Sequence, residues 1–442
     1  MHSHCRSCSQ RVSTSPCPDK FSKRRRWSLL DSEDALSWAK FVVIIVLAII
    51  IIALSLQNPK DVLRSRLQFR SWYSQYVYQF SNFAQNNCTE PYSVYLYGTR
   101  QNISQPTISG AGKFTLFVQP MINCLLENSS EYLKYQLGSS QVMLGITPTI
   151  IALLGASSEE LCLLALIGRR RLLGLLLATA SPSIYTERAF KYQDPDKILT
   201  ERQYHSHHGE DHVKPTMHSN LRWFFVSLEY IAVFCAIANI ATLNWELGVK
   251  TINTVNPNTV FMPMLWSLVG VMAHCAGAVV FDMRARRLDK GIKPMPRSTL
   301  RSCFSMLTRQ SPWPTILKTF TACKEMAVRE VCWGTEGPKE KLYFDLIPES
   351  RCFTSMGWTL SVLVVFHMIL GTLIMASTSF VGPKNALGIM ARYILSVVIC
   401  RIIVVYELAV LRVEYKNAAA DVCQCTVRDS GTEDVEEVSQ LS

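Results

Sequence analysis

Six ionisable side chains interrupt segments of the chain that are otherwise apolar, and these residues are the best placed to do chemistry. They are Glu159, Glu160, Glu229, His274, His367 and Arg401. Ionisable groups are costly inside a bilayer, so they normally face the interior of a helix bundle or a water-filled path. Counted from the expected cytosolic end of each segment at about 1.5 Å per residue, all six lie roughly 9–17 Å deep. They therefore form one candidate intramembrane polar layer.

Two interpretations of this layer remain open. The side chains can pair between helices and hold a bundle together, for example Arg401 with Glu229 or Glu160. Alternatively, they can line a path for a substrate or a proton. Arg401 and Glu407 are six residues apart and do not share a helical face, so each is expected to pair with another group.

A second candidate is a polar segment rich in histidine between two apolar segments. Its candidate metal ligands are His205, His207, His208 and His212. Imidazole and carboxylate groups at this density can bind Zn²⁺ or a similar ion, although many solvated loops have the same composition. The pair His208-x-x-x-His212 also resembles one histidine box of membrane desaturases and hydroxylases. That family needs three such boxes, and the other histidines here are isolated, so the sequence does not support that enzyme class.

The remaining motifs do not support catalysis or cofactor binding. Gly110-Ala111-Gly112-Lys113 lacks the upstream glycine and the following Ser or Thr of a phosphate-binding loop. Cys5-x-x-Cys8 has no second pair at zinc-finger spacing, which favours acylation or no role. We therefore predict a protein that is not an enzyme and that needs no cofactor.

Three N-glycosylation sequons indicate which side of a membrane one loop faces. They begin at Asn87, Asn102 and Asn128, and all lie between the first two apolar segments. A sequon can be used only on the lumenal or exterior side. Cys88 and Cys124 fall in the same loop, where oxidation is expected, so we predict that they form a disulfide. Two free thiols are the alternative.

The elements that must position these residues are apolar helices long enough to cross a bilayer. The predicted transmembrane helices cover residues 38–57, 142–168, 223–243, 259–281, 356–377 and 387–411. The predicted cytosolic segments are a disordered tail at 1–37, a histidine-containing loop at 169–222, a basic loop at 282–355 and a tail at 412–442. The fold class is an all-α integral membrane protein with six transmembrane helices and both termini cytosolic.

Two segments of this map are irregular. The exterior loop at 58–141 is long enough to fold, and its 92–97 and 114–118 stretches read as extended, so we predict a small α+β domain there. Residues 172–180 are apolar but too short to cross, and they are expected to lie in the interface or to re-enter the membrane.

Composition and charge agree with a membrane protein. Hydrophobic residues make up 49% of the chain and charged residues 18%, with a formal net charge of +11. Most of the 45 lysines and arginines fall in segments assigned to the cytosol, as the positive-inside rule requires. The basic residues flank apolar segments, so the expected partner is a lipid bilayer and not a nucleic acid. The compartment is the plasma membrane or the endomembrane system.

One stretch resembles a known group of proteins. It comprises Gly145-Ile-Thr-Pro148-Thr-Ile-Ile-Ala-Leu-Leu-Gly155, then Ser158-Glu159-Glu160, then Arg169-Arg170-Arg171-Leu-Leu. It is similar to an uncharacterised group of fungal multi-pass membrane proteins, which implies an endomembrane or cell-surface protein and no particular activity. The sequence thus favours a non-enzymatic accessory or scaffold protein with membrane-protein partners. The alternative is a small-solute or metal-ion transporter or channel that uses the polar layer.

Overall fold

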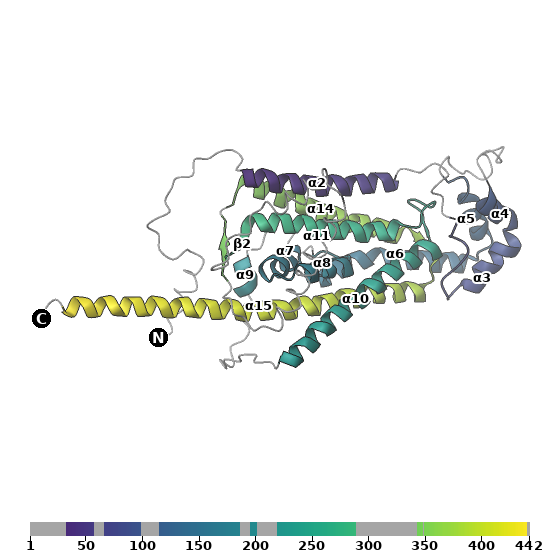
Figure 1. The fold of residues 1–442 in the computed structure, drawn as a ribbon. Helices are drawn as coiled ribbons and strands as arrows, with labels where there is room; N and C mark the ends of the chain where they lie inside the picture. Colours follow the sequence, from purple (N-terminus) through teal and green to yellow (C-terminus); the bar gives the residue numbers. More distant parts are fainter. Residues whose placement is uncertain are drawn as a thin grey trace, which may run out of the picture.

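The structure is a computed structural model of the chain, and it describes residues 32–56, 66–98, 115–185, 195–200, 219–288, 343–347 and 349–439. Within these residues the chain is mostly helical and contains very little strand. The long helices run side by side in an elongated bundle, and a small group of short helices covers one end (Figure 1). We call these short helices the cap. Helix α15 extends beyond the bundle at the opposite end.

Five helices in the described part of the chain are long and apolar enough to cross a membrane. They are α6 (Glu131–Leu154), α10 (Ser219–Lys250), α11 (Met262–Arg284), α14 (Arg351–Ala376) and α15 (Pro383–Ser439). In α10 and α15 the apolar spans are Phe224–Lys250 and Pro383–Val413. Large apolar side chains such as Ile231, Leu395 and Ile402 point outward and are exposed. Continuous apolar outer faces on several such helices define a multi-pass membrane protein.

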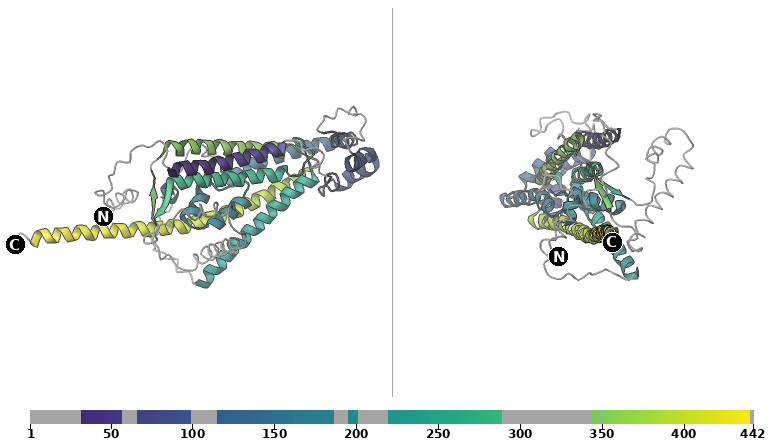
Figure 2. Two further views of the ribbon diagram at one scale, coloured as in Figure 1. Left: turned by 45° about the horizontal axis from the view of Figure 1, so that its top comes forward. Right: turned by 90° about the vertical axis from the view of Figure 1, so that its left-hand side faces the viewer.

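The predicted first span corresponds to helix α2 (Ser32–Leu56), which lies along α11 and α14 (Figure 2). Phe41 of α2 is buried in one cluster with Val280 of α11 and Met356 of α14. The described apolar part of α2, Ala39–Ile50, is shorter than the five candidate spans. Five helices of the described residues are therefore candidate spans by length and composition, where the sequence predicted six spans for the whole chain.

The second span differs from the one expected at residues 142–168. Helix α6 begins earlier, at Glu131, because the Ser130 hydroxyl accepts a hydrogen bond of 3.2 Å from the Leu133 N–H and caps the helix. The helix ends at Leu154. At Gly155 the chain passes so close to Ser183 that a β-carbon would lie 2.6 Å from its hydroxyl oxygen. Gly155 leaves the helical conformation, with ψ of 170°, and the close approach to Ser183 leaves no room there for a side chain.

A short helical hairpin follows the break. It consists of α7 (Ser158–Cys162), the π-helical turn η4 (Leu163–Ile167) and α8 (Arg171–Ala180). Its apolar side chains are buried against α10, α11 and α15 in one core cluster. Residues 172–180, which the sequence could not place, therefore form a helix inside the bundle (Figure 1).

Two small antiparallel strand pairs close the ends of the bundle. At the cap end, β1 (Ile252–Asn253) pairs with β4 (Thr378–Ser379) and joins the α10–α11 turn to the α14–α15 turn. At the opposite end, β2 (Ala285–Leu288) pairs with β3 (Tyr343–Leu346). The second pair brings together the two ends of the loop expected at 282–355. The sequence showed no sign of it, because its strands are four residues long and far apart in the chain.

The cap is helical in its described part, which corrects the expected α+β domain. It contains α3 (Val77–Asn82), η2 (Phe83–Asn87), α4 (Thr89–Tyr97) and α5 (Gln119–Glu127). The 92–97 stretch, read as extended, belongs to α4, and residues 115–118 form a turn. Aromatic residues favour strands only weakly, and packing decides in short segments. Here a helix buries Tyr95 completely, with its ring 4.8 Å from that of Phe69.

Candidate functional site: a buried ion-pair cluster

The turn between η4 and α8 directs one arginine into the bundle. Arg169 adopts a left-handed backbone with φ of 57°, and the Arg170 N–H donates to the Leu164 carbonyl oxygen at 3.2 Å. This geometry leaves Arg171 exposed and buries Arg170, which is only 4% exposed. Three consecutive arginines therefore have three different environments.

Arg170 lies between two glutamates from different helices. Its Nη2 is 3.2 Å from Oε2 of Glu229 on α10, and its Nη1 is ion-paired with Oε1 of Glu407 on α15. The guanidinium also stands 6.0 Å from the ring centroid of Tyr230. Glu229 and Glu407 are 8% and 5% exposed. We call Arg170, Glu229 and Glu407 the triad.

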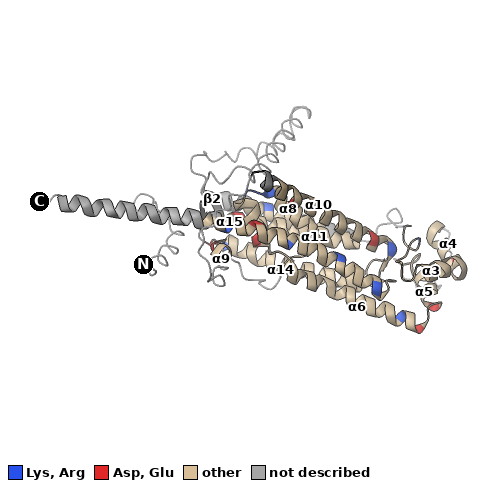
Figure 3. Ribbon diagram, turned by 90° about the horizontal axis from the view of Figure 1, so that it is seen from below, with Lys and Arg blue, Asp and Glu red and all other residues tan. Residues whose placement is uncertain are grey.

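The triad lies toward the end of the bundle away from the cap. Glu229 is five residues into the apolar span Phe224–Lys250, whose last residues lead to β1 under the cap. Glu407 is six residues before the end of the span Pro383–Val413. At about 1.5 Å per residue both are roughly 8–9 Å from the end of their span. Charged positions are sparse along the helices between the two ends of the bundle (Figure 3).

A second ion pair joins α7 to α15. Arg401 pairs with Oε2 of Glu160, one of the two partners that the sequence suggested for it. The same Glu160 oxygen accepts a hydrogen bond of 3.0 Å from the Ser157 N–H, which completes a capping box at the start of α7. This pair is less buried than the triad, with 35% of the Arg401 side chain exposed.

A third ion pair lies nearer the cap. Arg392 of α15 is 2.7 Å from Glu246 of α10, and its Nε donates to the Asn239 side-chain oxygen at 2.9 Å. Helices α10 and α15 are thus connected by charged groups at both ends of their contact.

The two histidines of the predicted layer lie away from these ion pairs, each with its own polar neighbour. His367 is buried, stacks on Trp266 with ring centroids 5.6 Å apart, and has Nε2 3.1 Å from the Trp266 carbonyl oxygen. Nδ1 of buried His274 is 3.4 Å from the hydroxyl of Ser158. Glu159 is half-buried in the first turn of α7. The structure therefore divides the predicted layer into separate contacts, and it does not gather the six residues at one point.

Sequence reasoning missed Arg170, which it read as part of a basic flank ending a span. A usable signal was present. The buried residues of α8 include Leu173 and Leu177, and the same helical stripe extended back by three residues falls on position 170. Arg171 lies off this stripe and is exposed.

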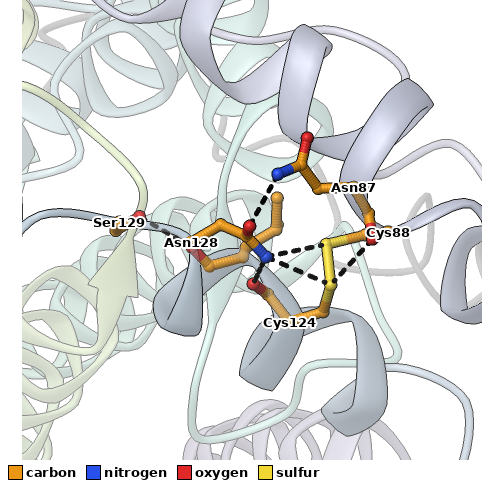
Figure 4. Close-up of a disulfide and its surroundings, with 6 residues drawn as sticks. Asn87, Cys88, Cys124, Asn128 and Ser129 are labelled. Atoms are coloured by element: carbon orange, nitrogen blue, oxygen red, sulfur yellow. Dashed lines mark hydrogen bonds between the residues drawn. A yellow bond between two sulfur atoms is a disulfide. The ribbon is translucent and has the colours of Figure 1, made fainter.

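Outside the bundle, the structure places the remaining candidates as follows. Cys88 and Cys124 are joined by a disulfide in the cap, next to Asn87 and Asn128 (Figure 4). Asn102 and the four candidate metal ligands His205, His207, His208 and His212 lie outside the described residues. Among the residues that the structure does describe, no three His, Cys, Asp or Glu side chains are grouped to hold a metal ion.

At the end away from the cap, the short helix α9 (Pro195–Thr200) is held against α15. The Tyr415 hydroxyl donates a hydrogen bond of 2.6 Å to the Asp196 carboxylate, and Arg412 donates to the Ile198 carbonyl oxygen at 3.1 Å. Burial, reinforced by Asp196, raises the pKa of Tyr415 above its ordinary value, so the phenol remains a donor at neutral pH.

The fold and the triad together define a mostly helical, multi-pass membrane protein with paired charges inside its bundle. Comparison of the chain with protein-family models, with curated proteins and with solved structures found no match.

Proposed function

We propose that this chain is a non-enzymatic accessory or scaffold protein with six transmembrane helices. Helix α2 is the sixth, the cap is exterior and glycosylated, and both termini are cytosolic. The observation that carries the scaffold role is that the arginines of the bundle are ion-paired: Arg170 with two glutamates, Arg401 with Glu160 and Arg392 with Glu246. Paired charges fix the helices relative to one another and specify one arrangement of the bundle.

Three features support this orientation. The disulfide lies in the cap, and disulfides persist on the exterior or lumenal side of membranes. Two sequons adjoin it. Arg169, Arg171 and Arg284 lie at the end of the bundle away from the cap, as expected for the side facing anionic cytosolic lipid.

A mass shift on glycosidase treatment, compared among the wild type and Asn87→Gln, Asn102→Gln and Asn128→Gln, tests the orientation. Retention of the full shift in all three variants would contradict it.

The second candidate function is transport of a small solute or a metal ion, and one observation favours it. The α7–α8 hairpin consists of short helices that meet non-helical chain inside the bundle, at 155–157 and 181–185. The two non-helical stretches touch, since the Tyr185 N–H donates to the Ala156 carbonyl oxygen at 3.3 Å. Discontinuous helices of this kind form the substrate sites of many transporters. The resemblance of the 145–173 region to a fungal membrane-protein group adds no activity to either candidate.

Flux in reconstituted vesicles separates the two functions. We expect purified protein in liposomes that contain a Zn²⁺-sensitive dye to give the same Zn²⁺ leak as empty liposomes. Arg401→Gln should lower thermal stability without changing the leak, because the Glu160 pair then serves only to hold α7 against α15. A leak above that of empty liposomes, abolished by Arg401→Gln in protein that is still folded, would overturn the scaffold role. In the same preparation, the amount of metal bound per protein molecule tests whether the histidine segment, 205–212, binds a metal ion.

A further inference from the structure

The charges of the triad do not balance when all three of its side chains are ionised. One guanidinium faces two carboxyl groups, and the three side chains are 4%, 9% and 7% exposed. If both carboxyl groups were ionised, the cluster would carry one uncompensated negative charge in a part of the bundle that excludes water. Groups in this position neutralise themselves by binding a proton or a counterion.

The contacts of Glu229 show where a proton would sit. Its Oε2 accepts a hydrogen bond from Nη2 of Arg170. Its Oε1 is buried and has no hydrogen-bond partner among the described residues. The Arg170 guanidinium also holds the Glu407 carboxyl group through its other terminal nitrogen, so the two carboxyl groups are neighbours on one guanidinium. Two ionised carboxylates are both acceptors and repel one another. A proton on one of them supplies the missing donor and turns the repulsion into a hydrogen bond.

Other charged and titratable groups lie near the pair in the described residues. From α10 the neighbour is the phenol ring of Tyr230, which faces the Arg170 guanidinium. Arg169, on the turn before α8, is half-buried, and Arg171, the first residue of α8, is exposed. On α15, Arg401 is ion-paired with Glu160 of α7, so this second pair is neutral by itself. Among the ion pairs of the described residues, the triad is therefore the one in which two buried carboxyl groups share a single guanidinium.

We propose that Glu229 and Glu407 bind a single proton between them, held in place by Arg170, and so form a buried proton-binding site. A proton fits this geometry better than a metal ion. Hard cations need several oxygen ligands, whereas here the guanidinium already occupies one oxygen of each carboxyl group. The proposal does not depend on whether the protein is a scaffold or a transporter.

The pH dependence of thermal stability tests this site in the full-length protein in detergent. A proton held more tightly by the folded than by the unfolded protein stabilises the fold at low pH, and this stabilisation is lost as the pH rises through the titration of the pair. We expect the wild-type Tm to fall between about pH 5 and pH 9. Glu229→Gln carries a permanent N–H donor in place of the proton, so this fall should disappear while the Tm near neutral pH is retained.

Glu160→Gln is the matched control, because it also replaces a bundle glutamate that faces an arginine, but in a one-to-one pair. It should lower the Tm at every pH and keep the wild-type slope. Identical slopes for the wild type and Glu229→Gln would overturn the proposal. So would a rise in the wild-type Tm at alkaline pH on adding Na⁺, which would assign the site to a metal cation.

A spectroscopic measurement keeps the proposal testable if Glu229→Gln does not fold. The wild-type protein should show the infrared carbonyl band of a protonated carboxyl group near neutral pH, and the band should be lost when the pH is raised. Glu407→Gln should lose this band, and Glu160→Gln should retain it. Absence of the band from the wild type at any pH at which it is folded would also overturn the site.

Discussion

The side-chain nitrogen of Asn87 donates a hydrogen bond of 2.7 Å to the side-chain oxygen of Asn128. The contact lies directly beside the Cys88–Cys124 disulfide, so the fold brings two of the three sequons together (Figure 4). Asn128 Nδ2 also donates to the carbonyl oxygen of Cys124 at 2.8 Å. The side-chain nitrogens of both asparagines are therefore hydrogen-bonded within the folded cap, but Asn87 is exposed, whereas Asn128 is half-buried and donates to a main-chain carbonyl.

This geometry predicts unequal use of the two sequons. Glycan transfer to Asn128 requires a half-buried nitrogen to leave the Cys124 carbonyl oxygen, whereas transfer to Asn87 requires a rearrangement only at the exposed surface of the cap. We expect Asn87→Gln to remove a glycan and Asn128→Gln to change the mass little on glycosidase treatment. Cys124→Ser, which prevents the disulfide, should raise the occupancy of Asn128. Equal mass shifts for the two asparagine variants would contradict this prediction.

The disulfide should stabilise the cap more than the bundle. It closes a loop with a sequence separation of 36, for which the chain-entropy argument gives a stabilisation of about 3–4 kcal/mol. Changing both Cys88 and Cys124 to Ser should therefore speed hydrogen exchange of cap amides and leave the amides of α11 and α14 protected. Cys235→Ser, which removes an exposed free cysteine of α10, is the control. Equal loss of protection in cap and bundle would show that the two unfold together.

Loss of Arg170 should be much more damaging than loss of its neighbour. Arg170→Met leaves two carboxyl groups buried against each other without their guanidinium, and breaking a buried pair from one side costs about 3–5 kcal/mol. Arg171→Met removes an exposed arginine one residue away and should change stability little. Thermal unfolding of the two variants in the same detergent makes the comparison.

The energetic coupling among the three side chains of the triad can be measured by combining Arg170→Met with substitutions of the two glutamates. When Glu229→Gln and Glu407→Gln are combined with it, part of the lost stability should return, because no unpaired carboxylate remains. Strictly additive losses across the three positions would show that the triad does not act as a unit.

The sequence predicted the long helices well, because a continuous apolar run of bilayer length leaves few alternatives. Helices α10, α11 and α14 overlap the predicted spans closely, and so does the apolar part of α15, Pro383–Val413, although α15 itself continues to Ser439. The apolar run expected at 142–168 is divided because Gly155 leaves the helical conformation and a capping box at Ser157 starts a new helix, α7. The sequence suggested two partners for Arg401, Glu229 and Glu160. The pair with Glu160 follows from the packing of α7 against α15, which the sequence does not reveal.

Two glycines of helix α14, Gly371 and Gly357, allow a test of how rigid the packing around buried His367 is. Gly371 of α14 lies against the indole ring of Trp266, and a β-carbon there would overlap ring atoms. The ring cannot move aside easily, since it stacks on His367 and meets the Tyr393 ring edge-on with centroids 5.9 Å apart. Gly371→Ala should therefore destabilise the bundle by about 1–3 kcal/mol, the usual cost of overpacking.

Gly357 of the same helix is the matched control. A β-carbon at this position would have no atom within 4 Å outside its own local helix backbone. Gly357→Ala should be neutral or stabilise the protein by up to about 1 kcal/mol, because alanine favours the helix more than glycine does. Opposite shifts in Tm for the two variants would tie the loss at Gly371 to the Trp266 contact. A similar Tm for both would mean that Trp266 can move aside, and that the stack of Trp266 on His367 is not rigid.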